Sequence, residues 1–405
     1  MRVLITGVHG FVGSNLVKAL SKDFEIYGLD IVSPEREGVV KTFSWDDLDE
    51  VNGAGGMVNG FPVDFDAIIH LAGKAHDTKN ESQAEVYFQV NTELTKRIYD
   101  YFLASSARRF VFFSSVKAAA DRVEGPYVDE NVEPKPVGPY GESKIEAEHY
   151  IMRFLGLAKR QSRALHFGRD DNKGCRDDRG ERSLHFGRDD KKGARDDRGE
   201  RSLHFGRDDN KGCRDDNKGC RDDNKGCRDD NKGCRDDNKG CRDDKRTYIL
   251  RPCMIHGPGN KGNLNLLYGV VKRGIPWPLG AFENKRTFTS IDNVCFIVHG
   301  LLTKEVESGI YHISDDEAVS TNELIEIICS ALGKKAHIWR VPRGLMEGIA
   351  RIGGILHLPL NPERLRKLTE NYVSSNAKIK RALGIEKLPV RAKDGLYKTI
   401  KAFSR

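Results

Sequence analysis

Arg2-Val-Leu-Ile-Thr-Gly-Val-His-Gly-Phe-Val-Gly13 is the stretch that decides the fold. Residues 2–6 are apolar and rich in strand-forming side chains, and residues 14–20 have the apolar spacing of a helix that buries one face. Between them stand glycines at Gly-x-x-Gly-x-x-Gly spacing. A strand, a Gly-rich turn and a helix predict a cradle for a pyrophosphate, in which a tight turn, close approach of the phosphate and packing of the helix on the strand need Gly7, Gly10 and Gly13 respectively.

A second apolar strand, residues 25–29, ends at Asp30, where the carboxylate can bind the ribose hydroxyls of a dinucleotide. A carboxylate at this point repels a 2′-phosphate, so the sequence favours NAD over NADP. Residues 65–71 form a further buried strand that ends in Ala72-Gly73. Small residues there are compatible with a cofactor that passes close to the backbone.

The residues for proton transfer come after the next strand, residues 108–113, which ends in Ser114-Ser115. Tyr140 and Lys144 follow at i and i+4, on one face of a helix predicted from 140 to about 159. A phenol that titrates near 10 needs a nearby cation to exchange protons at neutral pH, and the lysine supplies it. A serine hydroxyl at the strand end can hold the substrate oxygen. The pattern predicts an enzyme.

Residues 161–243 differ from the rest of the 405-residue chain, because about half of them are charged and they repeat the heptad Arg-Asp-Asp-Asn-Lys-Gly-Cys. The heptad offers too few apolar side chains to form a core, so we expect disorder. Its single, evenly spaced cysteines lack the pairing of a metal site, and no metal is predicted. The expected domains are residues 1–160, this insert, and residues 244–405, which complete the sheet and add a smaller C-terminal lobe.

Composition excludes several classes of protein. The formal net charge is +7, with 67 Lys and Arg against 60 Asp and Glu, which is too even to indicate a nucleic-acid partner. The chain has no apolar run long enough for a transmembrane helix, and its first residues are not typical of a signal peptide. Six of the nine cysteines belong to the repeat; the three others (Cys253, Cys295 and Cys329) are scattered. We therefore expect a cytoplasmic protein without membrane insertion.

These motifs resemble those of the extended short-chain dehydrogenases/reductases, which include the nucleotide-sugar epimerases and dehydratases. The resemblance covers residues 1–159 and 245–402 and implies an α/β fold, a Rossmann-type doubly wound parallel sheet, with NAD as cofactor and a UDP-sugar as substrate. It implies a catalytic set of Ser115, Tyr140 and Lys144. Implied cofactor contacts are Gly7, Gly10, Phe11, Val12, Gly13, Asp30, Leu71, Ala72, Gly73, Asn91, Ser114, Tyr140, Lys144 and Pro252.

The C-terminal part resembles the family's sugar-nucleotide lobe. Arg286 stands two residues before an aromatic residue, where the family has the arginine that clamps the nucleotide diphosphate. Ser320 and Glu323 have the spacing of a helix capping box. The substrate is expected to meet Ser115, Lys117 and Arg286, and a homodimer through helices at about 83–105 and 140–158 is compatible with the family.

The sequence departs from most epimerases at Ser114-Ser115-Val-Lys117, which resembles a bacterial branch that makes polysaccharide precursors. That branch includes reductases acting at C4 of UDP-linked amino sugars. Two activities therefore stay open: C4 epimerisation of a UDP-hexose or UDP-N-acetylhexosamine, and reduction of a UDP-4-keto-6-deoxy-N-acetylhexosamine. A non-catalytic NAD-binding regulator is the alternative of another class, although the complete Ser115, Tyr140 and Lys144 set argues against it.

Overall fold

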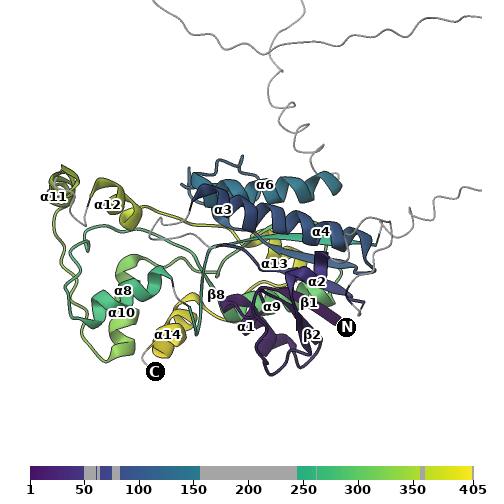
Figure 1. The fold of residues 1–405 in the computed structure, drawn as a ribbon. Coiled ribbons are helices and arrows are strands. Elements are labelled where there is room, and N and C mark those ends of the chain that lie inside the picture. Colours follow the sequence, from purple (N-terminus) through teal and green to yellow (C-terminus); the bar gives the residue numbers. More distant parts are fainter. Residues whose placement is uncertain are drawn as a thin grey trace, which may run out of the picture. The chain divides into compact units, whose positions relative to one another are not determined.

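Seven parallel strands form the central sheet, in the order β3-β2-β1-β4-β5-β6-β9 (Figure 1). The order reverses between β1 and β4, and such a switch point opens a crevice at the carboxyl ends of the strands. The predicted doubly wound sheet is confirmed. The strands are β1 (Arg2–Thr6), β2 (Glu25–Leu29), β3 (Lys41–Phe43), β4 (Ala67–His70), β5 (Arg109–Phe113), β6 (Arg246–Pro252) and β9 (Gly309–Ile313).

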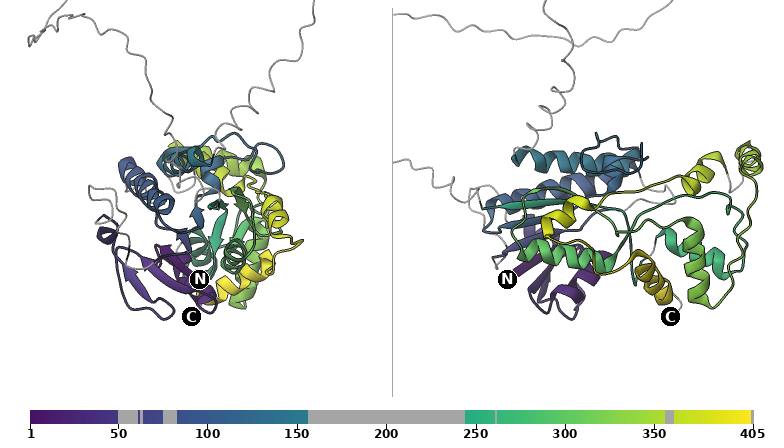
Figure 2. Two further views of the ribbon diagram at one scale, coloured as in Figure 1. Left: turned by 90° about the vertical axis from the view of Figure 1, so that its right-hand side faces the viewer. Right: turned by 180° about the vertical axis from the view of Figure 1, so that it is seen from behind.

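Helices cover both faces of this sheet (Figures 1 and 2). One face packs against α1 (Phe11–Leu20), α9 (Ile291–Thr303) and α13 (Ala377–Leu383), whose apolar side chains form one core with the strands. The other face packs against α4 (Leu94–Ala104) and α6 (Gly138–Phe154) around an aromatic-rich second core. The remaining elements near this face are α2 (Trp45–Asp49), α3 (Ala84–Phe88), a π-helical turn η1 (Gln89–Glu93) and α5 (Val116–Ala119).

The C-terminal part has its own apolar core. A two-stranded parallel ladder, β7 (Met254–His256) with β8 (Phe288–Ser290), leads into it from the sheet. The core joins α8 (Asn263–Lys272), α10 (Thr321–Leu332) and α14 (Ala392–Phe403), and a smaller cluster joins α11 (Arg343–Ile355) to α12 (Pro362–Thr369). The predicted capping box is confirmed at the start of α10, where the Ser320 hydroxyl accepts from the Glu323 amide and the Glu323 carboxylate accepts from the Ser320 amide.

The structure is a computed structural model that describes residues 1–49, 61, 64–74, 83–155, 244–260, 262–355 and 361–403. The repeat at 161–243 lies outside these residues, so its predicted disorder stays a prediction. Within the described ranges, no helix is long and apolar enough to cross a membrane. Most element ends lie within about two residues of the sequence prediction, but two helices begin earlier than predicted: α1 at Phe11 instead of residue 14, and α6 at Gly138 instead of Tyr140. A proline in the first turn of α6 favours that start.

Candidate active site

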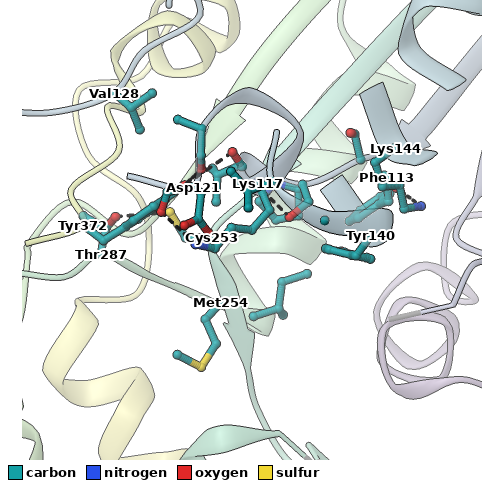
Figure 3. A pocket seen from close by; sticks show the side chains of 18 of the residues that line it. Phe113, Lys117, Asp121, Val128, Tyr140, Lys144, Cys253, Met254, Thr287 and Tyr372 are labelled. Carbon is teal, nitrogen blue, oxygen red and sulfur yellow. Dashed lines mark hydrogen bonds and ion pairs between the residues drawn. The ribbon is translucent and has the colours of Figure 1, made fainter. Parts of the chain in front are cut away.

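A cavity of about 1640 Å³ opens along the carboxyl ends of the sheet, and its wall continues into the C-terminal part (Figure 3). Most of the predicted site residues line it, although they come from distant parts of the chain. Asp30, Ala72 and Asn91 are not part of the lining. The predicted residues on the wall are Gly7, Gly10, Phe11, Val12, Gly13, Leu71, Gly73, Ser114, Ser115, Lys117, Tyr140, Lys144, Pro252 and Arg286.

The Gly-rich turn is too tight for side chains at two of its glycines. Gly7 has a φ of +69°, and a Cβ there would lie 3.0 Å from the amide nitrogen of Ala72. A Cβ on Gly13 would overlap the carbonyl oxygens of Gly7 and Val8, so α1 can pack on this turn only with glycine. The described turn thus leaves open backbone facing the cavity at the amino end of α1, which fits the phosphates of a dinucleotide.

Asp30 follows β2 and fixes this turn from the side. Its Oδ2 accepts from the amide of His9 at 3.0 Å, and its Oδ1 accepts from the amide of Ile31 at 2.8 Å. A carboxylate has lone pairs beyond these two bonds, so it can also accept from ribose hydroxyls. The residues present therefore fit NAD, with Asp30 both ordering the turn and presenting a negative charge.

A chain of buried hydrogen bonds joins the ends of β1 and β4, and the sequence analysis missed it. The Thr6 hydroxyl accepts from the amides of Leu71 and Ala72, and it lies 2.7 Å from His70 Nδ1. His70 Nε2 lies 2.9 Å from the Thr95 hydroxyl, which donates to the Asn91 carbonyl oxygen. This sequence of donors requires a neutral histidine, and burial lowers the His70 pKa well below its usual value. The sequence offered one signal for this chain of hydrogen bonds: Thr6 and His70 are polar residues at the ends of two apolar strands.

Asn91 lies behind the cavity wall and holds the loop after β4. Its Oδ1 accepts from the Lys74 amide, and its Nδ2 donates to the Lys74 carbonyl oxygen and the Ser143 hydroxyl. A Cβ on Gly73 would lie 2.9 Å from Asn91 Oδ1 and 3.0 Å from Lys144 Nζ. Gly73 therefore lets the loop pass between the amide and the ammonium. Asn91 itself lies in the π-helical turn, a distortion often found at functional sites.

Tyr140 and Lys144 project from α6 (Figure 3). Ser115, which follows β5, forms a hydrogen bond with Tyr140. Burial raises the Tyr140 pKa, and the hydrogen bond with the Ser115 hydroxyl lowers it in part. Lys144 Nζ donates to the Phe113 carbonyl oxygen at 3.0 Å. Desolvation lowers the Lys144 pKa to about 8, against the opposing effect of Glu148.

Ser114, the other serine of the pair, has a different partner. The Ser114 hydroxyl donates to Glu148, a fully buried carboxylate one turn beyond Lys144 on α6. Glu148 also accepts from Arg251 of β6, through Nε at 3.0 Å and Nη2 at 2.6 Å. This buried ion pair was not anticipated, although Glu148 stands four residues after Lys144 in the sequence. Ser114 is thus directed into the protein, whereas Ser115 is directed to Tyr140.

His312 extends the Glu148–Arg251 pair into the C-terminal part. Its Nε2 lies 3.5 Å from Arg251 Nη1, and its Nδ1 lies 3.0 Å from the Ser374 hydroxyl. Burial and the neighbouring Arg251 lower the His312 pKa to about 3, so the ring is neutral. Helix α6, the sheet and the C-terminal segment therefore share one polar network.

On the far side of the cavity, Lys117 forms an ion pair with Asp121 at 2.9 Å (Figure 3). Its Nζ also lies 4.8 Å from the centroid of the Tyr372 ring. The Tyr372 hydroxyl donates to the Ala120 carbonyl oxygen at 2.8 Å, which holds this ring beneath the lysine. Arg286 lies farther along the wall, where its guanidinium donates to the carbonyl oxygens of Lys367 and Glu370.

Comparisons with known proteins agree with this site. Residues 3–156 match the model of the NAD dependent epimerase/dehydratase family. The UDP-glucose 4-epimerase of Vibrio cholerae is 26% identical over 355 residues, which are 84% of this chain and 78% of that protein. An Escherichia coli O157:H7 protein, N-acetyl-alpha-D-glucosaminyl-diphospho-ditrans,octacis-undecaprenol 4-epimerase, is 27% identical over 38% of this chain and 44% of its own length.

Solved structures share the fold. The Bordetella bronchiseptica enzyme WbmG in complex with NAD has a TM-score of 0.59 at 15% identity, over 100% of this chain and 94% of that one. The Thermotoga maritima UDP-glucose 4-epimerase with UDP-glucose has a TM-score of 0.59 at 16% identity, over 100% and 99%. Together with the Gly-rich turn and the Ser115, Tyr140 and Lys144 cluster, the family match identifies residues 3–156 as a domain of the NAD dependent epimerase/dehydratase family, in agreement with the resemblance to the extended short-chain dehydrogenases/reductases.

Proposed function

We propose that this chain is a C4 epimerase of a UDP-hexose or UDP-N-acetylhexosamine, and that it supplies a precursor of a surface polysaccharide. One observation carries the proposal: the Ser115–Tyr140 hydrogen bond lies on the same cavity wall as Lys144 and the Gly-rich turn. A hydroxyl to be oxidised would thereby meet a proton acceptor beside a dinucleotide site. The names of the relatives support the choice of carbon and of sugar nucleotide.

In this mechanism the Tyr140 phenolate removes the proton of the C4 hydroxyl, and Ser115 holds the oxygen through its own hydroxyl. NAD, which the Gly-rich turn and Asp30 would hold, would supply the acceptor and the donor for the C4 hydride. Lys144 lies one turn from Tyr140, and its ammonium stabilises the phenolate against the burial that raises the tyrosine pKa. Gly73 leaves room for this ammonium at the cofactor side of the wall.

Two of the cations that line the cavity are candidates for substrate contacts, Arg286 and Lys117. Arg286 suits the diphosphate, because a guanidinium fork can bond two phosphate oxygens at once. To do so it must exchange its bonds to the carbonyl oxygens of Lys367 and Glu370 for bonds to phosphate. Lys117, fixed by Asp121 and Tyr372, is placed to contact the sugar.

The proposal is tested by incubating the full chain with UDP-glucose or UDP-N-acetylglucosamine and following the C4 epimer by NMR. We expect epimer formation without net consumption of NAD. Tyr140→Phe should lower kcat by about 10²–10⁴-fold, since it removes the general base. Tyr150→Phe is the matched control, because this tyrosine lies on the same helix but bonds to Asp100 at the surface.

The same experiment separates the rival activities. Stoichiometric loss of NADH with a UDP-4-keto-6-deoxy-N-acetylhexosamine, and no epimerisation, would identify a 4-reductase and overturn the epimerase. NAD binding without turnover of any of these substrates would support a non-catalytic regulator instead.

A further inference from the structure

Helix α11 (Arg343–Ile355) has two apolar faces, and the residues that the structure describes cover only one of them. Met346 and Ala350 are buried against Leu279 and Leu365. On the other face, exposed large side chains recur one turn apart. Leu345, Ile349 and Ile352 are 57%, 45% and 58% exposed. Monomeric soluble proteins rarely expose a large contiguous apolar patch, so such a stripe indicates an interaction surface.

A further exposed apolar side chain, Trp339, comes shortly before the helix in the sequence. It stands four residues before α11 and is 57% exposed. Tryptophan is the side chain most favoured where an apolar phase meets water, because its ring is apolar and its N–H is polar. Leu345, Ile349, Ile352 and Trp339 are called the α11 face below.

The charged residues in the sequence around the α11 face are mostly basic. Residues 334–352 hold five basic side chains and a single acidic one, Glu347. Arg340 and Arg351 are exposed beside the apolar stripe. Arg343 is used differently, since it donates to the Ala281 carbonyl oxygen and lies over the Phe282 ring, which ties α11 to the protein. The partner of this face is therefore expected to be apolar in its interior and anionic at its rim.

Helix α11 packs against α12, which contributes to the wall of the cavity. α11 lies at the outer edge of the C-terminal helices, next to α12 (Figures 1 and 2). Leu365 of α12 packs against α11 from one side, while Arg366 and Lys367 of the same helix line the cavity. Whatever binds the α11 face is thus held next to the wall that receives the substrate.

We propose that the α11 face docks on the surface of an anionic phospholipid bilayer. A helix with a leucine and isoleucine stripe, a neighbouring tryptophan and flanking arginines is the type that lies in the plane of a membrane interface. The lipid tails cover the apolar stripe, and anionic headgroups pair with Arg340 and Arg351. The helix lies on the bilayer and does not cross it. The charge of the rim favours this partner over a second copy of the chain, whose own α11 face carries the same positive charge.

Flotation of the full chain with vesicles tests the proposal. We expect binding to vesicles of phosphatidylcholine with 30% phosphatidylglycerol, weak binding to phosphatidylcholine alone, and release at high salt. The double variant Ile349→Glu/Ile352→Glu should weaken binding at least about twentyfold. Arg340→Gln/Arg351→Gln should weaken it about tenfold on anionic vesicles only. Leu266→Glu is the matched control, because Leu266 is an exposed leucine on α8.

A second readout begins with the unmodified chain, so it does not depend on whether the two double variants fold. Brominated lipids in the vesicles should quench the tryptophan fluorescence of the unmodified chain, and Trp339→Phe should remove most of that quenching. Three results would overturn the proposal: equal binding to neutral and anionic vesicles, no binding to either, or binding unchanged by both double variants. A dimer that Ile349→Glu/Ile352→Glu converts to a monomer, without lipid binding, would assign the face to a second copy instead.

Discussion

Lys144 is the residue whose charge we expect to set the upper pH limit of activity. It is almost fully buried, and its pKa of about 8 lies below the usual value for lysine. Above that pH the ammonium is lost, and with it the stabilisation of the Tyr140 phenolate. We expect kcat/KM of the free enzyme to fall as pH rises through about 8. Initial rates between pH 6 and 10, in buffers of constant ionic strength, measure this limb. A rate that keeps rising up to pH 10 would contradict the role given to Lys144.

Glu148 sets the position of that limb from within the protein. Its negative charge raises the Lys144 pKa, so Glu148→Gln should move the alkaline limb to lower pH. The variant also leaves Arg251 buried without a counter-ion, which should cost about 3–5 kcal/mol of unfolding free energy. The pH profile and urea unfolding measure the two effects.

Glu146→Gln is the control for this variant. Glu146 lies on the same helix, but it is half exposed and pairs with Lys96 at the surface. It should change stability by about 0–1 kcal/mol and leave the pH profile in place. If both variants shifted the alkaline limb equally, a general charge effect would replace the specific one.

At the scale of single residues, the sequence predicts the residues that belong to a motif, but it does not predict their hydrogen-bond and ion-pair partners. Tyr140 and Lys144 were identified because four residues separate them on one helix. The partner of Glu148 is Arg251, 103 positions away and beyond the repeat. No local spacing reports such a pair, since it is created when α6 packs across β6. His70 was missed for the same reason: its role depends on Thr6 and Thr95 from two other elements.

At the scale of elements, the Gly-rich turn at residues 7–13 leaves no room for a side chain at Gly13. Gly13→Ala places a methyl group against the carbonyl oxygens of Gly7 and Val8, so α1 must move away from β1. We expect a loss of about 1–3 kcal/mol in unfolding free energy and weaker NAD binding. Thermal melting and NAD titration measure these.

Gly269→Ala is the opposite case on α8. A Cβ there meets no atom within 4 Å, so alanine should stabilise that helix by about 0.5–1 kcal/mol. A Gly13→Ala variant that melts as late as Gly269→Ala would show that the turn can relax.

The same elements show why the sheet was predictable and the cavity was not. Apolar runs that end in Asp30, Gly73 and Ser115 give the strands and their direction, because parallel strands end at one edge. The far wall of the cavity is built by Lys117, Asp121 and Tyr372, which meet only after the C-terminal segment returns to the sheet. The contact between Lys117 and a tyrosine 255 residues later has no signal in local periodicity.

For the whole molecule, two neutral histidines make stability depend on pH. Burial lowers the pKa values of His70 and His312, in the latter case to about 3. Below about pH 6.5 the unfolded chain binds protons that the folded chain does not, so the unfolding free energy falls with decreasing pH. Each histidine contributes up to about 1.4 kcal/mol per pH unit. Urea unfolding at pH 7.5, 6.5 and 5.5 measures the slope, which His312→Gln should flatten. The exposed His149 is the control, since His149→Gln should leave the slope unchanged.

Removal of residues 161–243 should change little in the molecule. α6 ends at Phe154 and β6 begins at Arg246, so the repeat joins the chain at the edge of the sheet opposite the cavity. Closure entropy changes only slowly with loop length. We expect kcat within about twofold and a melting temperature within a few degrees of the full chain. An activity loss beyond tenfold would show that the repeat contributes to the site.

The π-helical turn at Gln89–Glu93 also has a consequence for how this chain can vary in length. A π turn holds one residue more than the α-helix around it, so it acts as a phase shift of about 100° between α3 and α4. Deletion of any one residue here would restore a regular helix, and it would rotate Tyr87 of α3 away from the cavity while α4 kept its place in the core. We therefore expect the chain to tolerate loss of its 83-residue repeat better than loss of one residue of this turn.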